Sequence, residues 1–202
     1  KRFANESNSY HDMMSALFDA LAPGEKAEAW LICDHAFQRR YGLGYARPRP
    51  FPLAGVLASG YLKRGRTIHD LALACGIDAE GLEATLTRYN EAAREGKDPE
   101  FGRGSSAYNR IQGEAEHHPN PCVAPIEKGP FYAVKIVAGS LGTFAGLRTD
   151  ENACVLDAHH APITGLYAVG NDMSSIMGGN YPAGGITLGP GMTFGYIAAH
   201  HA

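Results

Sequence analysis

The sequence has few charged residues, almost no net charge and no long apolar run. Charged side chains make up 19% of the 202 residues, and the formal net charge is −3. Because a nucleic-acid surface needs a strong excess of basic residues, no nucleic-acid partner is predicted. Apolar stretches are interrupted well before the roughly 20 residues that a membrane-spanning helix needs, so no transmembrane segment is predicted. A hydrophobic fraction of 45% excludes an intrinsically disordered chain.

Cysteine is scarce as well, and the histidines are badly placed for a metal. The four cysteines lie far apart and form no C-x-x-C pair (Cys33, Cys75, Cys122 and Cys154). This spacing favours a reduced, cytoplasmic protein over a disulfide scaffold or a zinc site. Three His-His pairs occur, at residues 117–118, 159–160 and 200–201, and adjacent side chains point to different faces of a helix or strand. No metal site is therefore predicted.

Common catalytic motifs are also missing. The sequence contains no P-loop, no G-x-S-x-G nucleophile elbow and no H-E-x-x-H, which argues against phosphoryl transfer, serine hydrolysis and zinc proteolysis. One formal match to the dinucleotide fingerprint G-x-G-x-x-[GA] starts at Gly102. It follows a charged loop instead of a strand, so we interpret it as accidental.

Glycine, by contrast, is abundant and unevenly distributed. The chain has 25 glycines among 202 residues, about 12% against the usual ~7%, and nine of them fall between residues 165 and 195. In that stretch an apolar strand is predicted to end at Val169, a turn to follow at residues 170–172, and a helix to run from about Ile186 to His200. Glycines let the main chain approach a flat ligand, and a helix start attracts negative charge. A cofactor site and a set of tight turns are both consistent with this pattern.

Hydrophobic periodicity predicts helices in the first part of the chain and strands in the second. Helices are predicted behind three residues whose side chains can accept hydrogen bonds from a first helical turn: Ser9, Thr67 and Asp78. Strands are predicted at residues 30–33, 131–137, 143–148, 154–157 and 166–169. Residues 97–125 lack periodicity and are predicted to form a long surface loop.

Residues 166–196 resemble the C-terminal flavin-binding segment of the FAD-dependent fumarate reductase and succinate dehydrogenase flavoprotein superfamily. The opening Arg2-Phe3-Ala4-Asn5-Glu6 is similar to the Arg-Phe-x-Asn-Glu motif that begins part of the capping domain in that superfamily. Residues 67–104 resemble its helical cap, and residues 130–133 resemble the return to the flavin domain. The resemblance implies an α+β fold, in which a helical, small-sheet capping domain for substrate precedes C-terminal strands and a helix that complete a Rossmann-like FAD-binding domain.

The change from helices to strands places the predicted boundary near residue 125. The predicted domains are a capping domain at residues 1–125 and the C-terminal segment of the FAD-binding domain at residues 126–202. Members of the superfamily hold the ADP half of FAD with an N-terminal G-x-G-x-x-G fingerprint, which this sequence lacks in that context. We therefore expect the chain to be the C-terminal part of a longer protein, with the N-terminal FAD-binding part as its partner. The chain alone is expected to be inactive.

The resemblance also implies FAD as the cofactor and residues that bind it. Asn171 and Asp172 would hold the ribityl or pyrophosphate part, and backbone N–H groups at the start of the last helix would stabilise negative charge at flavin N1 and O2. The implied cofactor-binding residues are Gly170, Asn171, Asp172, Gly184, Ile186, Thr187 and Leu188.

Two tyrosines distinguish this chain from the fumarate reductases. Tyr10 and Tyr181 stand where those enzymes carry a proton-donating and a carboxylate-binding arginine, so a dicarboxylate substrate is not expected. Together with Gly185, the tyrosines are similar to those of the 3-ketosteroid dehydrogenases. This resemblance implies that the Tyr181 hydroxyl and the Gly185 N–H polarise a C3 carbonyl, while Tyr10 removes the C2 proton. Flavin N5 would accept the hydride from C1.

The expected function is an FAD-dependent oxidoreductase that acts on the CH–CH group of a small, steroid-like cyclic ketone. One alternative is another branch of the superfamily, either a 4-ene steroid dehydrogenase or a fumarate reductase/succinate dehydrogenase-type reductase of a different enone. A second alternative is a flavin-free fragment that acts only as a binding module.

Overall fold

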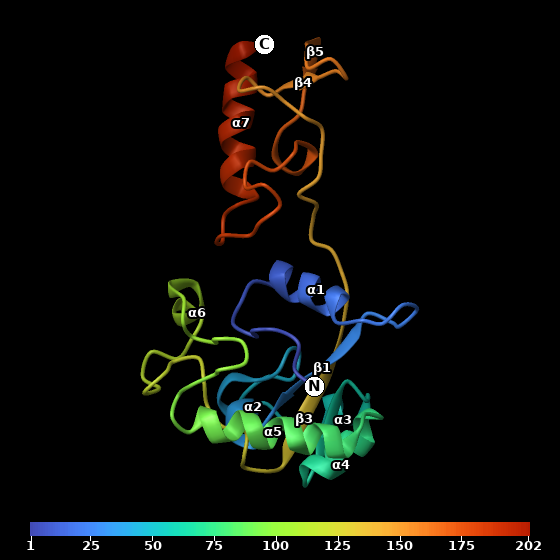
Figure 1. The fold of residues 1–202 in the computed structure, drawn as a ribbon, viewed down its shortest axis with the longest axis vertical. Helices are drawn as coiled ribbons and strands as arrows, with labels where there is room; N and C mark the ends of the chain where they lie inside the picture. Colours follow the sequence, from blue (N-terminus) through green and yellow to red (C-terminus); the bar gives the residue numbers. More distant parts are fainter. The chain divides into compact units, whose positions relative to one another are not determined.

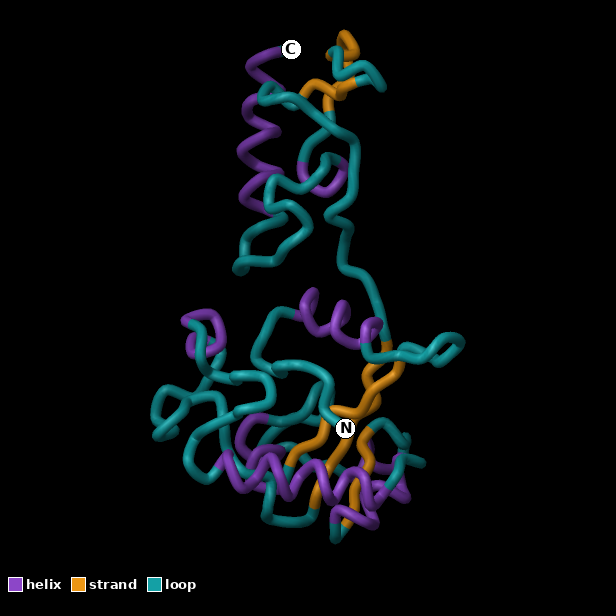
Figure 2. Tube along the Cα trace, viewed as in Figure 1, coloured by secondary structure: helices purple, strands orange, loops and turns teal.

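The computed structural model describes all residues from Lys1 to Ala202 and contains two units (Figure 1). Unit 1 comprises residues 1–138 and unit 2 comprises residues 139–202. Helices, small sheets and long loops make up the chain, which is α+β as predicted (Figure 2). None of its helices is both long and apolar enough to cross a lipid bilayer.

Unit 1 is built on a three-stranded antiparallel sheet whose middle strand comes last in the sequence. Strand β3 (Phe131–Val137) lies between β1 (Glu28–Cys33) and β2 (Leu62–Gly65). The first four residues of β3 are buried, so the strand forms part of the core. Because β3 belongs to this sheet, the border between the units falls after Ala138, whereas the sequence pattern places it near residue 125.

Six helices belong to unit 1: α1 (Tyr10–Asp19), α2 (His35–Tyr41), α3 (Ala54–Ala58), α4 (Ile68–Cys75), α5 (Ala79–Ala93) and α6 (Ala107–Ile111). The predicted caps of α1 and α4 are confirmed. The Ser9 hydroxyl accepts a hydrogen bond from the Asp12 N–H, and Thr67 forms a reciprocal capping box with Asp70. Asp78 precedes α5, but its side chain makes no capping hydrogen bond. Helix α4 packs against both α5 and the sheet.

Residues 97–125 do not form the surface loop that the sequence predicts. They include the short helix α6 and five buried residues: Asp98, Gly104, Asn109, Cys122 and Val123. Hydrophobic periodicity does not detect this region, because much of what it buries is polar and is held by hydrogen bonds. Hydrophobic periodicity also fails to predict α2, α3 and β2, because these elements are too short to show a repeat of apolar residues.

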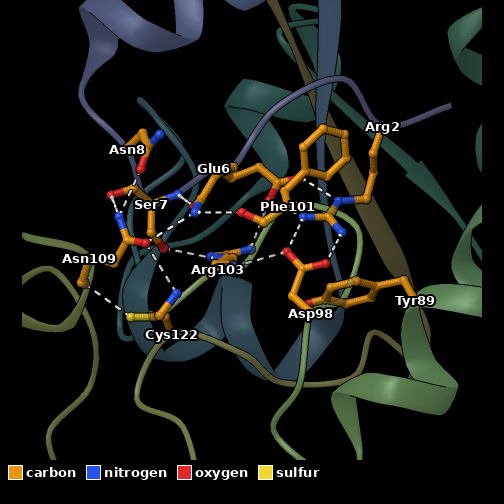
Figure 3. A network of polar contacts seen from close by, with 12 residues as sticks. Arg2, Glu6, Ser7, Asn8, Tyr89, Asp98, Phe101, Arg103, Asn109 and Cys122 are labelled. Carbon is orange, nitrogen blue, oxygen red and sulfur yellow. Dashed lines mark hydrogen bonds and ion pairs between the residues drawn. The ribbon is translucent and has the colours of Figure 1, made fainter. Parts of the chain in front are cut away.

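The N-terminal segment is fixed to this region by the guanidinium of Arg2 (Figure 3). Arg2 pairs with Asp98 and with Glu6, each at 2.7 Å, and lies 4.9 Å from the ring centroids of Tyr89 and Phe101. The side chains of Arg2 and Asp98 are only 11% and 1% exposed. Burial opposes the ionisation of Asp98, but the hydrogen bonds and charge of Arg2 outweigh it and lower the pKa of Asp98. Burial of Arg2 is likewise outweighed by its two carboxylate partners, which raise its pKa.

Unit 2 consists of a short hairpin, a 3₁₀ turn and one long helix. Strands β4 (Cys154–Leu156) and β5 (Pro162–Tyr167) pair antiparallel, η1 (Gly170–Asp172) follows, and α7 (Leu188–His201) is the last element. Its small core consists of Val155, Ala168 and Met173, against which Phe194 of α7 packs.

Two strands predicted in unit 2 differ from the structure. Residues 143–148 form no strand, and Leu147 makes only an isolated bridge with Met173. Gly146 lies so close to Met173 that an added methyl group would sit 2.6 Å from its main chain, which fits a close crossing of two segments better than a ladder. Strand β5 starts and ends earlier than the strand predicted at residues 166–169.

Asp98→Asn should destabilise the protein at pH 7 by about 3 kcal/mol, because it leaves a buried guanidinium with fewer negative partners. The pKa of Asp98 is lower in the folded than in the unfolded chain. Its stabilisation is therefore present above about pH 4 and is lost as the pH falls through the folded-state pKa. Urea unfolding should show a gap between wild type and variant that is largest near neutrality and shrinks in acid.

Glu95→Gln is the matched control, because Glu95 is an exposed carboxylate that also pairs with a basic residue, Lys97. Its loss should leave the urea midpoint unchanged, since exposed ion pairs contribute little. Equal effects of the two variants at pH 7, or a gap that persists in strong acid, would contradict the role of the buried pair.

Candidate functional site

Tyr10 is the first residue of α1, and its position is set by the cap of that helix. Ser9 is buried, and its hydroxyl accepts the Asp12 N–H at 3.2 Å, which fixes the start of the helix. Tyr10 itself is 48% exposed, and Phe18, about two turns further along, is exposed as well, whereas Leu17 is buried. Helix α1 therefore carries an aromatic face that the core of unit 1 does not use.

Tyr181 lies in the glycine-rich loop of unit 2 and packs against Phe144. The two ring centroids are 6.5 Å apart with an interplanar angle of 75°, an edge-to-face arrangement. Phe144 also fixes the loop through its main chain, because its carbonyl accepts the Ser175 N–H at 3.0 Å. Sequence reasoning missed Phe144, since it is distant from Tyr181 along the chain and no local pattern marks the contact.

The main chain between Tyr181 and α7 is open on one side. A methyl group built on Gly184 or Gly185 would have no neighbour within 4 Å, and Gly185 has a φ of +97°, which L side chains rarely adopt. Helix α7 begins at Leu188, slightly later than predicted, and the Thr187 side chain makes no capping hydrogen bond. In the first turn of α7, the Gly189 and Gly191 N–H groups donate to the Gly185 and Thr187 carbonyls, and Pro190 has no N–H. The amides just before them and the positive end of the helix dipole suit this end of α7 to an electron-rich group.

The turn η1 packs against the first turn of α7. Gly170 has a φ of +61°, and a methyl group built on it would lie 3.5 Å from the Cα of Gly191. The Asp172 carbonyl accepts the Leu147 N–H at 2.8 Å, while the side chains of Asn171 and Asp172 are exposed. The two glycines thus let turn and helix approach each other, and the polar side chains remain at the surface.

The predicted cofactor residues of unit 2 lie around the start of α7. They are Gly170, Asn171 and Asp172 at the contacting turn, and Gly184, Ile186, Thr187 and Leu188 in the segment that leads into the helix. Tyr181 and Gly185 belong to the same glycine-rich segment. Tyr10 belongs to unit 1. All four cysteines are free, and no group of three or more His, Cys, Asp or Glu side chains could hold a metal ion.

Helix α7 has an apolar face that unit 2 leaves exposed. Leu188, Met192 and Tyr196 recur at every fourth position, and all three are strongly exposed. This spacing places them on one side of the helix. Apolar side chains aligned in this way usually pack against another element, so the face is suited to contact with further polypeptide.

Known proteins are similar to this chain in sequence and in fold. A family model described as "FAD binding domain" matches residues 1–188. The chain is 46% identical over 198 residues to 4-oxocyclohex-2-ene-1-carboxylate 5-dehydrogenase of Sinomonas cyclohexanicum, covering 98% of this chain and 34% of that relative. It is 42% identical over 204 residues to 3-oxosteroid 1-dehydrogenase of Mycolicibacterium smegmatis, covering 98% and 36%. The chain thus spans about a third of the length of these curated relatives.

A solved structure is similar to this chain as well. The crystal structure of 3-ketosteroid delta1-dehydrogenase from Sterolibacterium denitrificans, in complex with 1,4-androstadiene-3,17-dione, matches with a TM-score of 0.91 and 42% identity. The match covers 100% of this chain and 36% of that chain. The predicted resemblance is confirmed, and the chain belongs to the FAD-binding domain family of flavoproteins, with 3-oxosteroid dehydrogenases among its relatives.

Proposed function

We propose that the chain is the capping and C-terminal flavin-binding part of an FAD-dependent oxidoreductase that removes hydrogen from a CH–CH group next to a ring ketone. The observation that carries this proposal is the combination of Tyr181, the Gly185 N–H and open main chain at the start of α7. A phenol and an amide are donors suited to a neutral ketone oxygen. Apart from histidines, Arg148 is the one basic residue of unit 2, so this unit does not offer the paired cations that fix a dicarboxylate.

The names of the relatives support a ring ketone as the substrate class. One relative is named for a 3-oxosteroid and the other for a 4-oxocyclohexene carboxylate, so both names describe dehydrogenation of a ring that carries an oxo group. A feature common to the two is the ketone itself. We therefore propose a steroid-like cyclic ketone as the small-molecule substrate of this protein.

The open main chain of unit 2 supports a flavin placed at the start of α7. The space over Gly184 and Gly185 is what a flat ring requires, because a side chain at either position would fill it. We assign the electron-rich edge of the ring to Gly184 and the amides of Ile186, Thr187 and Leu188. We assign the ribityl or pyrophosphate part to Gly170, Asn171 and Asp172. Bound there, FAD supplies the acceptor for a hydride.

The residues of this chain act on the ketone and the neighbouring C–H bond. The Tyr181 hydroxyl and the Gly185 N–H donate hydrogen bonds to the ketone oxygen, which stabilises negative charge on it and lowers the pKa of the adjacent C–H. Tyr10 accepts that proton at its phenolic oxygen. Because a phenol has an ordinary pKa of about 10, Tyr10 has to be held where its phenolate is favoured.

The exposed face of α7 is proposed to contact the N-terminal FAD-binding part of the same protein. That contact would remove Leu188, Met192 and Tyr196 from water. The curated relatives, which are about three times as long as this chain, have the additional polypeptide that such a contact needs. In this arrangement unit 1 is the capping domain for substrate and unit 2 completes the FAD-binding domain.

Substrate turnover by the complete, FAD-loaded protein tests this function. A 3-ketosteroid and 4-oxocyclohex-2-ene-1-carboxylate are each mixed with the protein without oxygen, and loss of flavin colour and formation of the ring double bond are followed. We expect a ring ketone to reduce the flavin and fumarate not to reoxidise it. Fumarate reduction without oxidation of either ketone would overturn the proposal. If the complete protein takes up no FAD but still binds a ketone, a binding module would be indicated.

Tyr181→Phe should lower kcat/KM for the ketone about 100- to 1,000-fold, because it removes one of two donors to the carbonyl oxygen. FAD content should not change, since the ring and its contact with Phe144 remain. Tyr45→Phe is the control, because Tyr45 is an exposed phenol of unit 1 outside the proposed site. Unchanged turnover by the Tyr181 variant would remove this residue from the mechanism.

Gly184→Ala should weaken FAD binding about tenfold, equivalent to roughly 1.4 kcal/mol, without changing the urea midpoint. Its methyl group enters open space and the residue has no positive φ, so the folded chain tolerates the change. Gly139→Ala is the matched control, since a methyl group there also meets nothing within 4 Å. The flavin-to-protein ratio after dialysis is measured for both, and equal retention would contradict placement of the ring against Gly184.

A further inference from the structure

The side chain of Asn109 uses its full hydrogen-bonding capacity inside unit 1. It lies in α6 and is 1% exposed (Figure 3). Its Nδ2 donates to the Ser7 carbonyl and to Asn8 Oδ1, both at 2.9 Å. Its Oδ1 accepts from Asn5 Nδ2 at 3.0 Å and from the Gly104 N–H at 3.2 Å. Both donor hydrogens and both acceptor positions are thus paired, mostly with the N-terminal segment.

That segment leads directly into α1. Residues 5–8 form a turn closed by the Asn8 N–H, which donates to the Asn5 carbonyl at 3.0 Å. Ser9 follows as the buried cap, and Tyr10 is the first helical residue. The direction in which α1 leaves the turn therefore depends on the contacts that hold the turn in place.

Helix α1 packs only weakly against the other helices and strands of unit 1. Leu17 is its one buried residue. Asn109, by contrast, is itself anchored. Its N–H donates to Ser106 Oγ at 3.1 Å, and its carbonyl accepts the Cys122 thiol at 3.0 Å. The N-terminal turn is thus supported by a residue that lies 102 positions away from Ser7.

We infer that Asn109 is a positioning residue, which holds Tyr10 in place by fixing the turn before α1. This role rests on the proposed function of Tyr10 as the proton acceptor. The amide does not act on substrate or cofactor itself; it sets the place from which the phenol reaches the C–H bond. Because misplacing a reacting group by about 1 Å can cost roughly 100-fold in rate, its loss should affect proton removal more than substrate binding.

Asn109→Ala in the complete, FAD-loaded protein tests the role. With a 3-ketosteroid, kcat should fall about 10- to 100-fold, KM should change less than about threefold, and FAD content should be unchanged. In a Tyr10→Phe background the same substitution should cause no further fall in kcat, because the group that it positions is gone. This lack of additivity is a result that a general loss of stability would not produce.

Asn90→Ala is the matched control. Asn90 is also a buried amide of unit 1, and it pairs with the main chain of Ile126 at 2.8 and 2.9 Å, away from residues 5–9. Its loss should lower the urea midpoint and leave kcat unchanged. Asn8→Ala is a milder second variant, because Asn8 is exposed and gives up a single bond to Asn109. Asn8→Ala should also lower kcat in the wild-type background, and it should have no effect on kcat in the Tyr10→Phe background.

The Tyr10→Phe variant separates the two proposals. Full activity of this variant overturns the role of Tyr10, and with it the positioning role. If Tyr10→Phe is inactive or slow but kcat is unchanged in both Asn109→Ala and Asn8→Ala, only the positioning role is overturned. The positioning role alone is also overturned if Asn109→Ala lowers kcat by the same factor in the wild-type and Tyr10→Phe backgrounds. It is likewise overturned if Asn90→Ala lowers kcat as much as Asn109→Ala does.

Discussion

A buried guanidinium needs negatively charged partners in its immediate surroundings, and in unit 1 one of these partners comes from a distant part of the sequence. Arg2 takes the carboxylates of Glu6, in its own segment, and of Asp98, which is 96 residues away. This pairing holds the polar side chain of Asp98 in the interior, while its neighbours Lys97, Pro99 and Glu100 are exposed. Helix α6 follows this segment and brings Asn109 against the N-terminal turn, where it adds neutral hydrogen bonds to the ion pairs of Arg2.

Elements with a local signal could be predicted from the sequence. Ser9 and Thr67 mark helix starts because their own hydroxyls accept the first-turn amides, and the apolar run of β3 marks a buried strand. Helix α6 and the loop before it carry no such signal, since burying their polar groups becomes favourable only once distant partners are present. Residues 143–148 show the opposite failure, because a strand-like pattern finds no neighbouring strand to pair with.

The candidate site also has parts with a local sequence signal and parts that depend on contacts between distant residues. Glycine spacing before a helix marks the segment that contains Gly184 and Gly185, and the structure leaves open space at both positions. Their roles toward a cofactor and substrate follow from the family resemblance and stay predictions. The support that Phe144 gives to Tyr181 depends on a contact across the sequence, which no local pattern encodes. The family, predicted from the motifs, is confirmed, whereas the roles of Tyr10 and Tyr181 stay predictions.

Strand β3 is the middle strand of its sheet and also the last part of unit 1 to be synthesised. Strands β1 and β2 each pair with β3 and not with one another, so neither has a partner until residue 137 has left the ribosome. The sheet then has to close long loops in a single late step, which is an entropically slow event. Until that moment both outer strands are unpaired edges, the kind of segment through which a growing chain associates with other chains.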